Sequence, residues 1–310
     1  MKKATTIGLA VLLLLATLIP AGCVSIGSVG KIAVISLTGV VGSGSSSLIF
    51  GSTISPALVR EQLGKAEYDV AVKAVVLRVE SPGGAVAPCQ EILEEIEKIK
   101  QIKPVVVSMG DMAASGGYYI SAEADKIVAL PGTLTGSIGV ISQIPNIKGL
   151  YDKLGIEMQI FKSGKYKDMY SGLRELSSEE KEIMQRMTDE YYEQFIEVVA
   201  EGRGLSKEEV RNLATGQLYT GVEAKKLGLI DELGGLDVAI ASAAQLADIE
   251  TWQVEYYKPT PSLLESLLGM NLSSLAEVVQ LKLWGLGGED IVLLQTLSRS
   301  YPQPQYLCES

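Results

Sequence analysis

Histidine is absent from this sequence of 310 residues. Its absence excludes a Ser-His-Asp or Cys-His catalytic triad, a histidine proton shuttle and every metal site that needs a histidine ligand. Acid-base chemistry near neutral pH would therefore have to use a lysine, a carboxylate, a tyrosine or a cysteine. If the chain is an enzyme, its mechanism has to work without the commonest general base.

Basic residues and cysteines are also scarce. The chain has 27 lysine and arginine residues against 37 acidic residues, a formal net charge of −10. We therefore expect no nucleic-acid partner, because phosphate binding needs a basic surface. Three cysteines, Cys23, Cys89 and Cys308, lie far apart and lack metal-site spacing. An odd number gives no disulfide framework, and we interpret them as buried or incidental thiols.

Charged residues are missing from residues 4–30, and Ile7–Ile19 is nearly all apolar. Two lysines and the amino terminus precede this stretch, a pattern typical of an export signal or a transmembrane anchor. The positive-inside rule places the N-terminus in the cytoplasm and the chain after Lys31 outside it. We expect residues 1–30 to be an uncleaved single-pass anchor in the cell membrane. Cleavage, or lipidation at Cys23, is the alternative.

Short apolar runs alternate with amphipathic stretches from Lys31 to about Ile249, which favours parallel strands joined by helical crossovers. Serines that can cap helices predict helix starts at Ser55, Ser177 and Ser206, the last two with a glutamate three residues later. The expected strands are Ile32–Val41, Ala74–Glu80, Val105–Met109 and Lys126–Leu130.

Residues 251–310 break this alternation. Two prolines, Pro259 and Pro261, precede the leucine-rich segment Leu263–Leu286. We therefore expect one α/β domain over residues 31–250 and a C-terminal extension over residues 251–310. The extension is either a docked helix with a loose tail or a contact to another subunit or to the membrane surface.

Two glycine-rich turns follow buried strands and lead into helices, at Ser81–Gly84 and at Ala113–Gly117. Sites in parallel α/β folds form at the carboxyl ends of strands. Ser115, between small residues, can expose its hydroxyl there, and the backbone N–H groups of Gly84 and Gly116 can form a two-donor oxyanion hole. The alternative is that Ser115 only caps a helix while the glycines make tight turns.

Three motifs in order, Ser81–Gly84, Met109–Tyr119 and Pro131–Val140, resemble those of signal peptide peptidases of the SppA type. The resemblance runs from about Lys31 to Asp248. It implies a Clp/crotonase-like fold of repeated β-β-α units with a parallel sheet and helical crossovers. It also implies a catalytic domain over residues 31–250, a Ser-Lys dyad that needs no metal or other cofactor, and digestion of cleaved signal peptides at a membrane.

The resemblance also implies roles for individual residues. The serine of the Ala-Ala-Ser-Gly-Gly motif is Ser115, the nucleophile, and the lysine of the Gly-x-x-Lys-Asp segment is Lys167, the general base. Ser137 would hold the lysine amine by a hydrogen bond. Lys162 and Lys165 stay open as alternatives. A lysine can act as a base at neutral pH only if burial lowers its pKa from about 10.4.

The chain is about half the length of the duplicated bacterial form and resembles the short form, which assembles its site across neighbouring subunits. We therefore expect a homo-oligomeric ring, such as an octamer, that binds peptide substrates at the outer membrane face. Three alternatives are a related Ser-Lys protease with a specific membrane-protein substrate, a crotonase-like enzyme acting on acyl thioesters, and an inactive scaffold.

Overall fold

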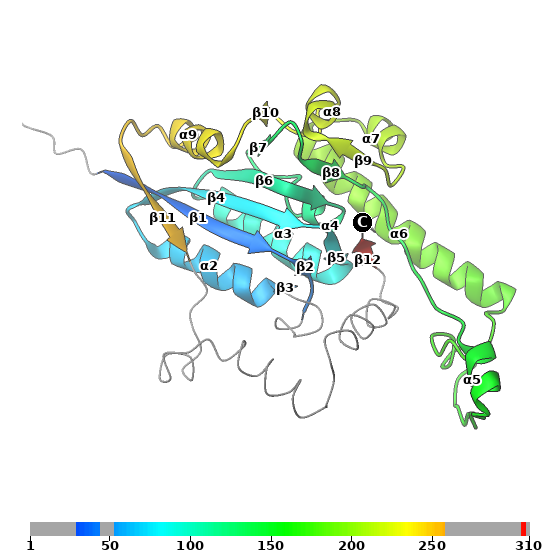
Figure 1. Cartoon of the computed structure of the whole chain (residues 1–310). Helices are drawn as coiled ribbons and strands as arrows, with labels where there is room; N and C mark the ends of the chain where they lie inside the picture. The colour runs from blue at the N-terminus through cyan, green and yellow to red at the C-terminus, as the bar shows by residue number, and fades with distance from the viewer. Residues whose placement is uncertain (1–28, 44–52, 258–304, 308–310) are drawn as a thin grey trace, which may run out of the picture.

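The computed structural model describes residues 29–43, 53–257 and 305–307 (Figure 1). The expected anchor lies outside these residues except for its last two positions, and the leucine-rich segment Leu263–Leu286 lies wholly outside them. Among the helices of the described residues, none combines the length and apolar character of a membrane span.

The main sheet confirms the expected parallel α/β fold. Its strands lie in the order β10-β7-β6-β4-β1-β11, and each neighbouring pair is parallel. The central strands consist mostly of valine, isoleucine, leucine and alanine, the composition expected of strands buried on both faces. The bounds are β1 Gly30–Thr38, β4 Val72–Ser81, β6 Val105–Ala114, β7 Lys126–Ala129, β10 Glu232–Leu233 and β11 Trp252–Tyr257.

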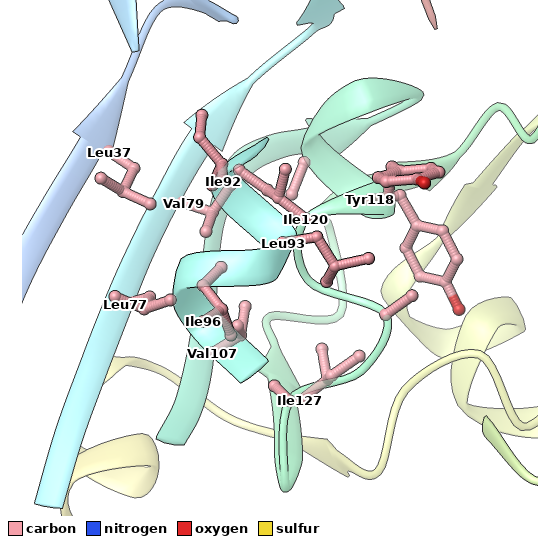
Figure 2. Close-up of a cluster of buried hydrophobic side chains, with 14 of the residues drawn as sticks. Leu37, Leu77, Val79, Ile92, Leu93, Ile96, Val107, Tyr118, Ile120 and Ile127 are labelled. Atoms are coloured by element: carbon pink, nitrogen blue, oxygen red, sulfur yellow. The ribbon is translucent and has the colours of Figure 1, made fainter. Parts of the chain in front are cut away.

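Helices cover both faces of this sheet. On one face, Leu77 and Val79 of β4 pack with Ile92 and Ile96 of α3 (Figure 2). On the other face, alternate strand residues such as Val76 pack against α9. The helices are α2 Pro56–Tyr68, α3 Val86–Lys100, α4 Gly116–Tyr119, α5 Lys148–Leu154, α6 Ser178–Arg203, α7 Lys207–Leu213, α8 Gly221–Lys226 and α9 Leu236–Leu246.

The predicted helix starts are confirmed. Ser55 caps α2 by accepting a hydrogen bond from the Leu58 amide, and Pro56 occupies the first turn. Ser177 and Ser206 each form a reciprocal capping box with the glutamate three residues later. These predictions from local sequence are correct because each capping side chain accepts a hydrogen bond from a backbone N–H group that would otherwise be unpaired at the start of the helix.

A second, smaller sheet lies beside the carboxyl ends of the main strands (Figure 1). Its strands have the order β12-β5-β2-β3, with bounds β2 Val40–Val41, β3 Thr53–Ile54, β5 Gly83–Ala85 and β12 Gln305–Leu307. Strand β8 (Leu134–Gly136) continues the main sheet by pairing with the end of β6, and β9 (Leu218–Thr220) pairs with β8.

Most strand ends lie within three residues of the sequence expectation, and two boundaries differ by five residues or more. Strand β6 runs to Ala114, five residues beyond Met109, because its last residues pair with β8 instead of turning away at once. Residues Trp252–Tyr257, at the start of the expected extension, form β11 and pair with β1 along its length. The chain therefore adds one more parallel strand to the sheet after residue 250.

Candidate active site

Ser115 lies at the junction of β6 and α4. Its backbone has φ 53° and ψ −119°, a region that costs free energy for any residue with a Cβ. Two backbone hydrogen bonds hold it there: the Ser115 amide donates to the Gly136 carbonyl at 2.8 Å, and the Tyr119 amide donates to the Ser115 carbonyl at 2.8 Å. The strained backbone is therefore held in place by a neighbouring strand and by the following helix.

The Ser115 side chain is fully buried, with 0% relative exposure. Its Oγ has no hydrogen-bond partner among the described residues. It also makes no capping bond to α4, so the alternative that Ser115 merely caps a helix loses its support. Buried hydroxyls are nearly always hydrogen-bonded, and an unpartnered one in a strained turn is expected at a reactive centre.

The two glycines proposed as the oxyanion hole lie next to each other. A Cβ built on Gly116 would stand 3.0 Å from the Gly84 nitrogen and 2.7 Å from the Cys89 Sγ. A Cβ on Gly84 would stand 2.0 Å from the Val41 carbonyl oxygen. Neither position has room for a side chain, so the peptide backbones of both turns come close together beside Ser115.

Cys89, which borders this site, is buried as expected. Burial in apolar surroundings raises the pKa of the Cys89 thiol. The thiol therefore stays protonated near neutral pH, and a thiolate nucleophile does not compete with Ser115.

Ser137 is brought beside Ser115 by the pairing of β6 with β8. Ala114 lies opposite Gly136 in a parallel register, so Ser115 and Ser137 each follow the end of a paired strand. Ser137 is buried, has φ 49°, and donates its backbone N–H to the Gln217 carbonyl at 2.8 Å. Within the described part of the chain its hydroxyl makes no hydrogen bond, which leaves it available to a group that enters the site.

Lys167 lies elsewhere, on a projecting segment that we call the arm, residues 141–176 (Figure 1). Its side chain is exposed, and its amine has no ion pair or hydrogen bond within the described residues. The two alternative lysines are occupied. Lys162 binds the Asp168 carboxylate at 2.6 Å, and Lys165 pairs with Glu179, a contact that raises the pKa of Lys165.

The carboxylate that follows Lys167 in the sequence is turned to other partners. Asp168 accepts hydrogen bonds from Lys162 and from the Arg174 guanidinium, which also binds Glu180 at 2.6 Å. Arg174 holds the pKa of the Asp168 carboxyl well below its usual range and lowers the pKa of Glu180 to about 2. No role for Arg174 was predicted from the sequence, although it lies six residues from each of these two acids, a spacing that allows it to fasten the arm to the start of α6.

The arm and Ser115 are well separated along α6. Phe195 packs edge-on against Tyr119 of α4, with ring centroids 5.2 Å apart, whereas Lys165 is held at the first turn of the helix by Glu179. The 16-residue step from Glu179 to Phe195 corresponds to about 24 Å of helix. One chain therefore brings together Ser115, Ser137, Gly84 and Gly116, but not Lys167.

Comparisons with known proteins place the chain in a family. The model of Peptidase family S49 matches residues 97–250. An Enterococcus faecium protein named signal peptide peptidase SppA is 38% identical over 246 residues, which cover 78% of this chain and 72% of that protein. The chain belongs to peptidase family S49.

Two further relatives are longer than this chain. Protease 4 of Salmonella typhi is 38% identical over 256 residues, 81% of this chain but 41% of that protein. The chloroplastic serine protease SPPA of Arabidopsis thaliana is 36% identical over 228 residues, 72% of this chain and 34% of that protein. The resemblance seen in the motifs is thus confirmed, and the chain is a serine protease of this family with a parallel sheet that fits a Clp/crotonase-like fold.

Proposed function

We propose that this chain is a membrane-anchored serine endopeptidase that digests cleaved signal peptides and other short hydrophobic peptides with a Ser-Lys dyad. The observation that carries the proposal is the Ser115 hydroxyl, buried without a partner in a strained turn beside Gly84 and Gly116. Membership of a serine protease family agrees with this assignment. It gives no reason to favour a crotonase-like acyl-thioester activity or an inactive scaffold.

In the proposed mechanism the Ser115 Oγ attacks the scissile carbonyl carbon. The N–H groups of Gly84 and Gly116 donate to the oxyanion of the tetrahedral intermediate, where each donor contributes on the order of 3 kcal/mol to lowering the barrier. A neutral lysine amine takes the Ser115 proton and passes it to the leaving amine. In the second half of the reaction the lysine amine takes a proton from water, and the water oxygen attacks the acyl-enzyme. The lysine then returns this proton to the Ser115 Oγ as the ester bond breaks. The Ser137 hydroxyl, which forms no hydrogen bond with any residue that the structure describes, would direct the lysine amine.

The lysine in this mechanism is Lys167 of a neighbouring copy. Among the three lysines of the segment, Lys162 and Lys165 already hold carboxylates, while Lys167 is exposed and unpaired within the described residues. The arm that carries it is held at Glu179, about 24 Å along α6 from Phe195, the residue that packs against Tyr119 of α4. An intersubunit contact would both supply the amine and bury it, and burial favours its neutral form.

The arm has the surface for such a contact. After α5, Ile156, Met158 and Ile160 occupy alternate positions of a segment without regular secondary structure and are all exposed, and Phe161 is 92% exposed. Apolar side chains in this density are uncommon on a surface that stays in water. We infer a homo-oligomeric ring, such as an octamer, in which each arm reaches the next subunit.

Anchoring and substrate class complete the proposal. The uncharged residues 4–30 support a single-pass anchor in the cell membrane, with the catalytic domain on the extracytoplasmic side. Cleaved signal peptides would reach such a site from the same membrane. Sites between subunits of a ring admit extended peptides and exclude folded proteins. The name of the Enterococcus relative, signal peptide peptidase, points to signal peptides as the substrate class. A specific membrane-protein substrate is the alternative.

The direct test is hydrolysis of a fluorogenic hydrophobic peptide by the full chain. Ser115→Ala and Lys167→Ala should each lower kcat by at least about 10³-fold, because each removes one reacting group. Lys165→Ala is the matched control and should keep nearly full activity. A fluorophosphonate should label the wild type and not Ser115→Ala. Activity that survives in Lys167→Ala and disappears in Lys165→Ala would identify the other lysine as the base.

Mixing the two inactive variants tests the shared site. If Ser115 and Lys167 of one site come from different subunits, mixed rings of Ser115→Ala and Lys167→Ala chains contain some interfaces with both groups intact. Activity should then return to a fraction of the wild-type value after the two variants are co-expressed. Persistent inactivity in mixed rings would show that both residues must belong to one chain.

A further inference from the structure

Large apolar side chains are exposed at the end of the molecule where the main strands begin. Val29 precedes β1, Val70 precedes β4 and Ile102 precedes β6, and their exposed fractions are 47%, 83% and 58%. Tyr68, the last residue of α2, is 83% exposed, and Trp252, the first residue of β11, is 37% exposed. Because these strands are parallel, they begin at the same end of the sheet. We call these five residues the apolar rim.

Polar contacts hold the segments of the apolar rim against one another. The amides of Gly30 and Lys31 at the start of β1 donate to the carbonyls just before β11 and β4, at 3.2 Å and 2.7 Å. The Lys103 ammonium, at the start of β6, binds the Glu67 and Asp69 carbonyls at the end of α2, at 3.0 Å and 2.8 Å. Single apolar side chains are normal on a protein surface, but a group gathered in one place marks a contact surface.

The apolar rim is also where the chain enters the domain. Residues 4–30 carry no charge, and Gly30, the last of them, is the first residue of β1. A membrane span of about 20 residues that begins after Lys3 ends near residue 23 and leaves only about six residues before β1. Such a short connection keeps the start of β1 close to the surface of the same membrane. In Figure 1 the start of β1 and the end of α2 lie opposite to the arm.

The composition of the rim fits the headgroup region of a bilayer. Tyrosine and tryptophan prefer this region because each combines an apolar ring with a polar group. The neighbouring charges do not favour an acidic partner. Lys31 is shared by Asp69 and Glu255, at 3.2 Å and 2.9 Å, and Glu67 and Glu250 are exposed acids of the same end. Binding should therefore depend on apolar contact and not on anionic lipid.

We propose that the apolar rim inserts into the headgroup region of the membrane that holds the anchor, and so fixes the orientation of the catalytic domain. This inference rests on the proposed function, because it takes residues 1–30 as an anchor. Ser115 follows the carboxyl end of β6, at the other end of the sheet, so docking would not cover the active site. At about 3.3 Å per residue, the ten residues of β4 separate the two ends by about 30 Å. Peptides would therefore be cleaved after they have left the bilayer.

Trp252 can report on this contact by its fluorescence. The chain has two tryptophans, so Trp284→Phe leaves Trp252 as the only one. The full chain with this change is reconstituted into phosphatidylcholine vesicles, with or without lipids that carry bromine near the headgroup end of their acyl chains. Bromine quenches tryptophan fluorescence only at contact distance, so tethering by the anchor is not sufficient for quenching.

Two further chains in the same background test whether the rim is the cause. In one, Tyr68→Asp and Val70→Asp are combined, because a carboxylate is costly to remove from water and both side chains are exposed in the fold. The matched control is Val222→Asp, which replaces an exposed apolar side chain of α8, a helix that packs against β8 and β10 away from the rim.

Brominated lipid should lower the Trp252 emission by about 2-fold, because interfacial side chains lie about 5–10 Å into the boundary between headgroups and acyl chains. Val222→Asp should show the same loss, and the Tyr68→Asp/Val70→Asp chain should show little. Equal emission with and without bromine in every chain would overturn the proposal. Equal quenching in the double variant would overturn it as well, because the anchor alone would explain the contact. Emission that responds to dilution of the protein in lipid, and not to bromine, would show that a second copy covers the rim instead.

The proposed function fails in a different way. Flotation on a density gradient shows whether the chain is anchored, and peptide hydrolysis in the same vesicles shows whether it is a peptidase. Active, vesicle-bound protein without quenching keeps the proposed function and removes the membrane-facing rim. Quenching in vesicle-bound chains that hydrolyse no peptide keeps the rim and removes the peptidase. Protein that does not float with the vesicles removes both the anchor and the rim.

Discussion

The Ser115 turn and the arm are built in opposite ways. The turn is buried, and its backbone is held by hydrogen bonds with the main chain of β8 and of α4, without any side chain taking part. The arm has few buried side chains and is fastened to α6 by ion pairs such as those of Arg174. A rigid nucleophile is thus combined with a lysine on an element that depends on its surroundings. The comparison suggests that assembly, and not folding of one chain, completes the site.

Apart from removal of Ser115 or Lys167 itself, the largest effect should come from filling the space beside the nucleophile. Gly116→Ala places a Cβ 2.7 Å from the Cys89 Sγ and 3.0 Å from the Gly84 nitrogen, so one of the two turns has to shift. Displacing an oxyanion donor should lower kcat by about 10²–10³-fold. Steady-state kinetics on the fluorogenic peptide measure this loss.

Gly64→Ala is the control for that substitution. Gly64 lies inside α2, and a Cβ there meets nothing within 4 Å, so activity should be unchanged and the helix slightly more stable. Equal activity of Gly116→Ala and wild type would remove the oxyanion role from this turn.

The elements of this site differ in how far local sequence determines them. Capping at Ser55, Ser177 and Ser206 was predicted correctly because each cap is satisfied within three residues. The capping box of Thr220 with Glu223 obeys the same rule and was missed. The two glycine-rich turns were also predicted, because a run of small residues between a strand and a helix is typical of a tight turn.

Long-range contacts could not be predicted in this way. The bond from the Ser115 amide to Gly136 depends on β8 lying beside β6, and no local pattern specifies that neighbour. The pairing of β12 with β5 joins segments more than 200 residues apart through only three residues. Motif register selected Lys167, but only the ion pairs of Lys162 and Lys165 distinguish it physically from its neighbours.

Ser137→Ala should have the next largest effect. Its hydroxyl is free within the described residues and lies beside the Ser115 turn, where it would direct the lysine amine. Its loss should lower kcat by about 10–100-fold, since a misdirected base is still present. KM should stay the same, and labelling of Ser115 by a fluorophosphonate should slow in proportion to kcat. An unchanged kcat would leave Ser137 as a turn residue only.

A change at the tip of the arm should act through assembly. Phe161→Asp replaces a side chain that is 92% exposed, so one isolated chain should fold as before. In a ring the new carboxylate would be buried against a neighbour at a cost of several kcal/mol. Sedimentation should show smaller species, and specific activity should fall about 10-fold at dilute protein.

The same substitution has a nearby control. Lys153→Asp introduces a carboxylate at an exposed position of α5 and replaces no apolar side chain. It should leave the sedimentation of the protein unchanged. A fully active, stable monomer in either variant, or in the wild type, would contradict the shared site.

The smallest effect is a loosening of the arm in acid that spares the Ser115 turn. Arg174 and the Ser177 amide lower the pKa of Glu180 to about 2 from a usual value of 4.5. A carboxyl with a lowered pKa in the fold contributes stability above its unfolded pKa, and this contribution disappears as the pH falls from about 4.5 to about 2. Arg174 also lowers the pKa of the Asp168 carboxyl, so this group adds to the effect. The protection factors of arm amides, which compare each exchange rate with that of an unstructured chain at the same pH, should therefore fall across this range while those of the buried β6 do not.

Two variants show whether Arg174 is the cause. Arg174→Met should give low arm protection factors already at pH 7 and remove most of their pH dependence, because both carboxylates lose their main partner. Lys148→Met removes a surface pair with Asp152 on the same arm, where both side chains are about 60% exposed, and such pairs contribute little. It should leave the exchange profile unchanged. If β6 and the arm lose protection together as the pH falls, the arm is not an independent element, and the contrast between a rigid turn and an adjustable arm fails.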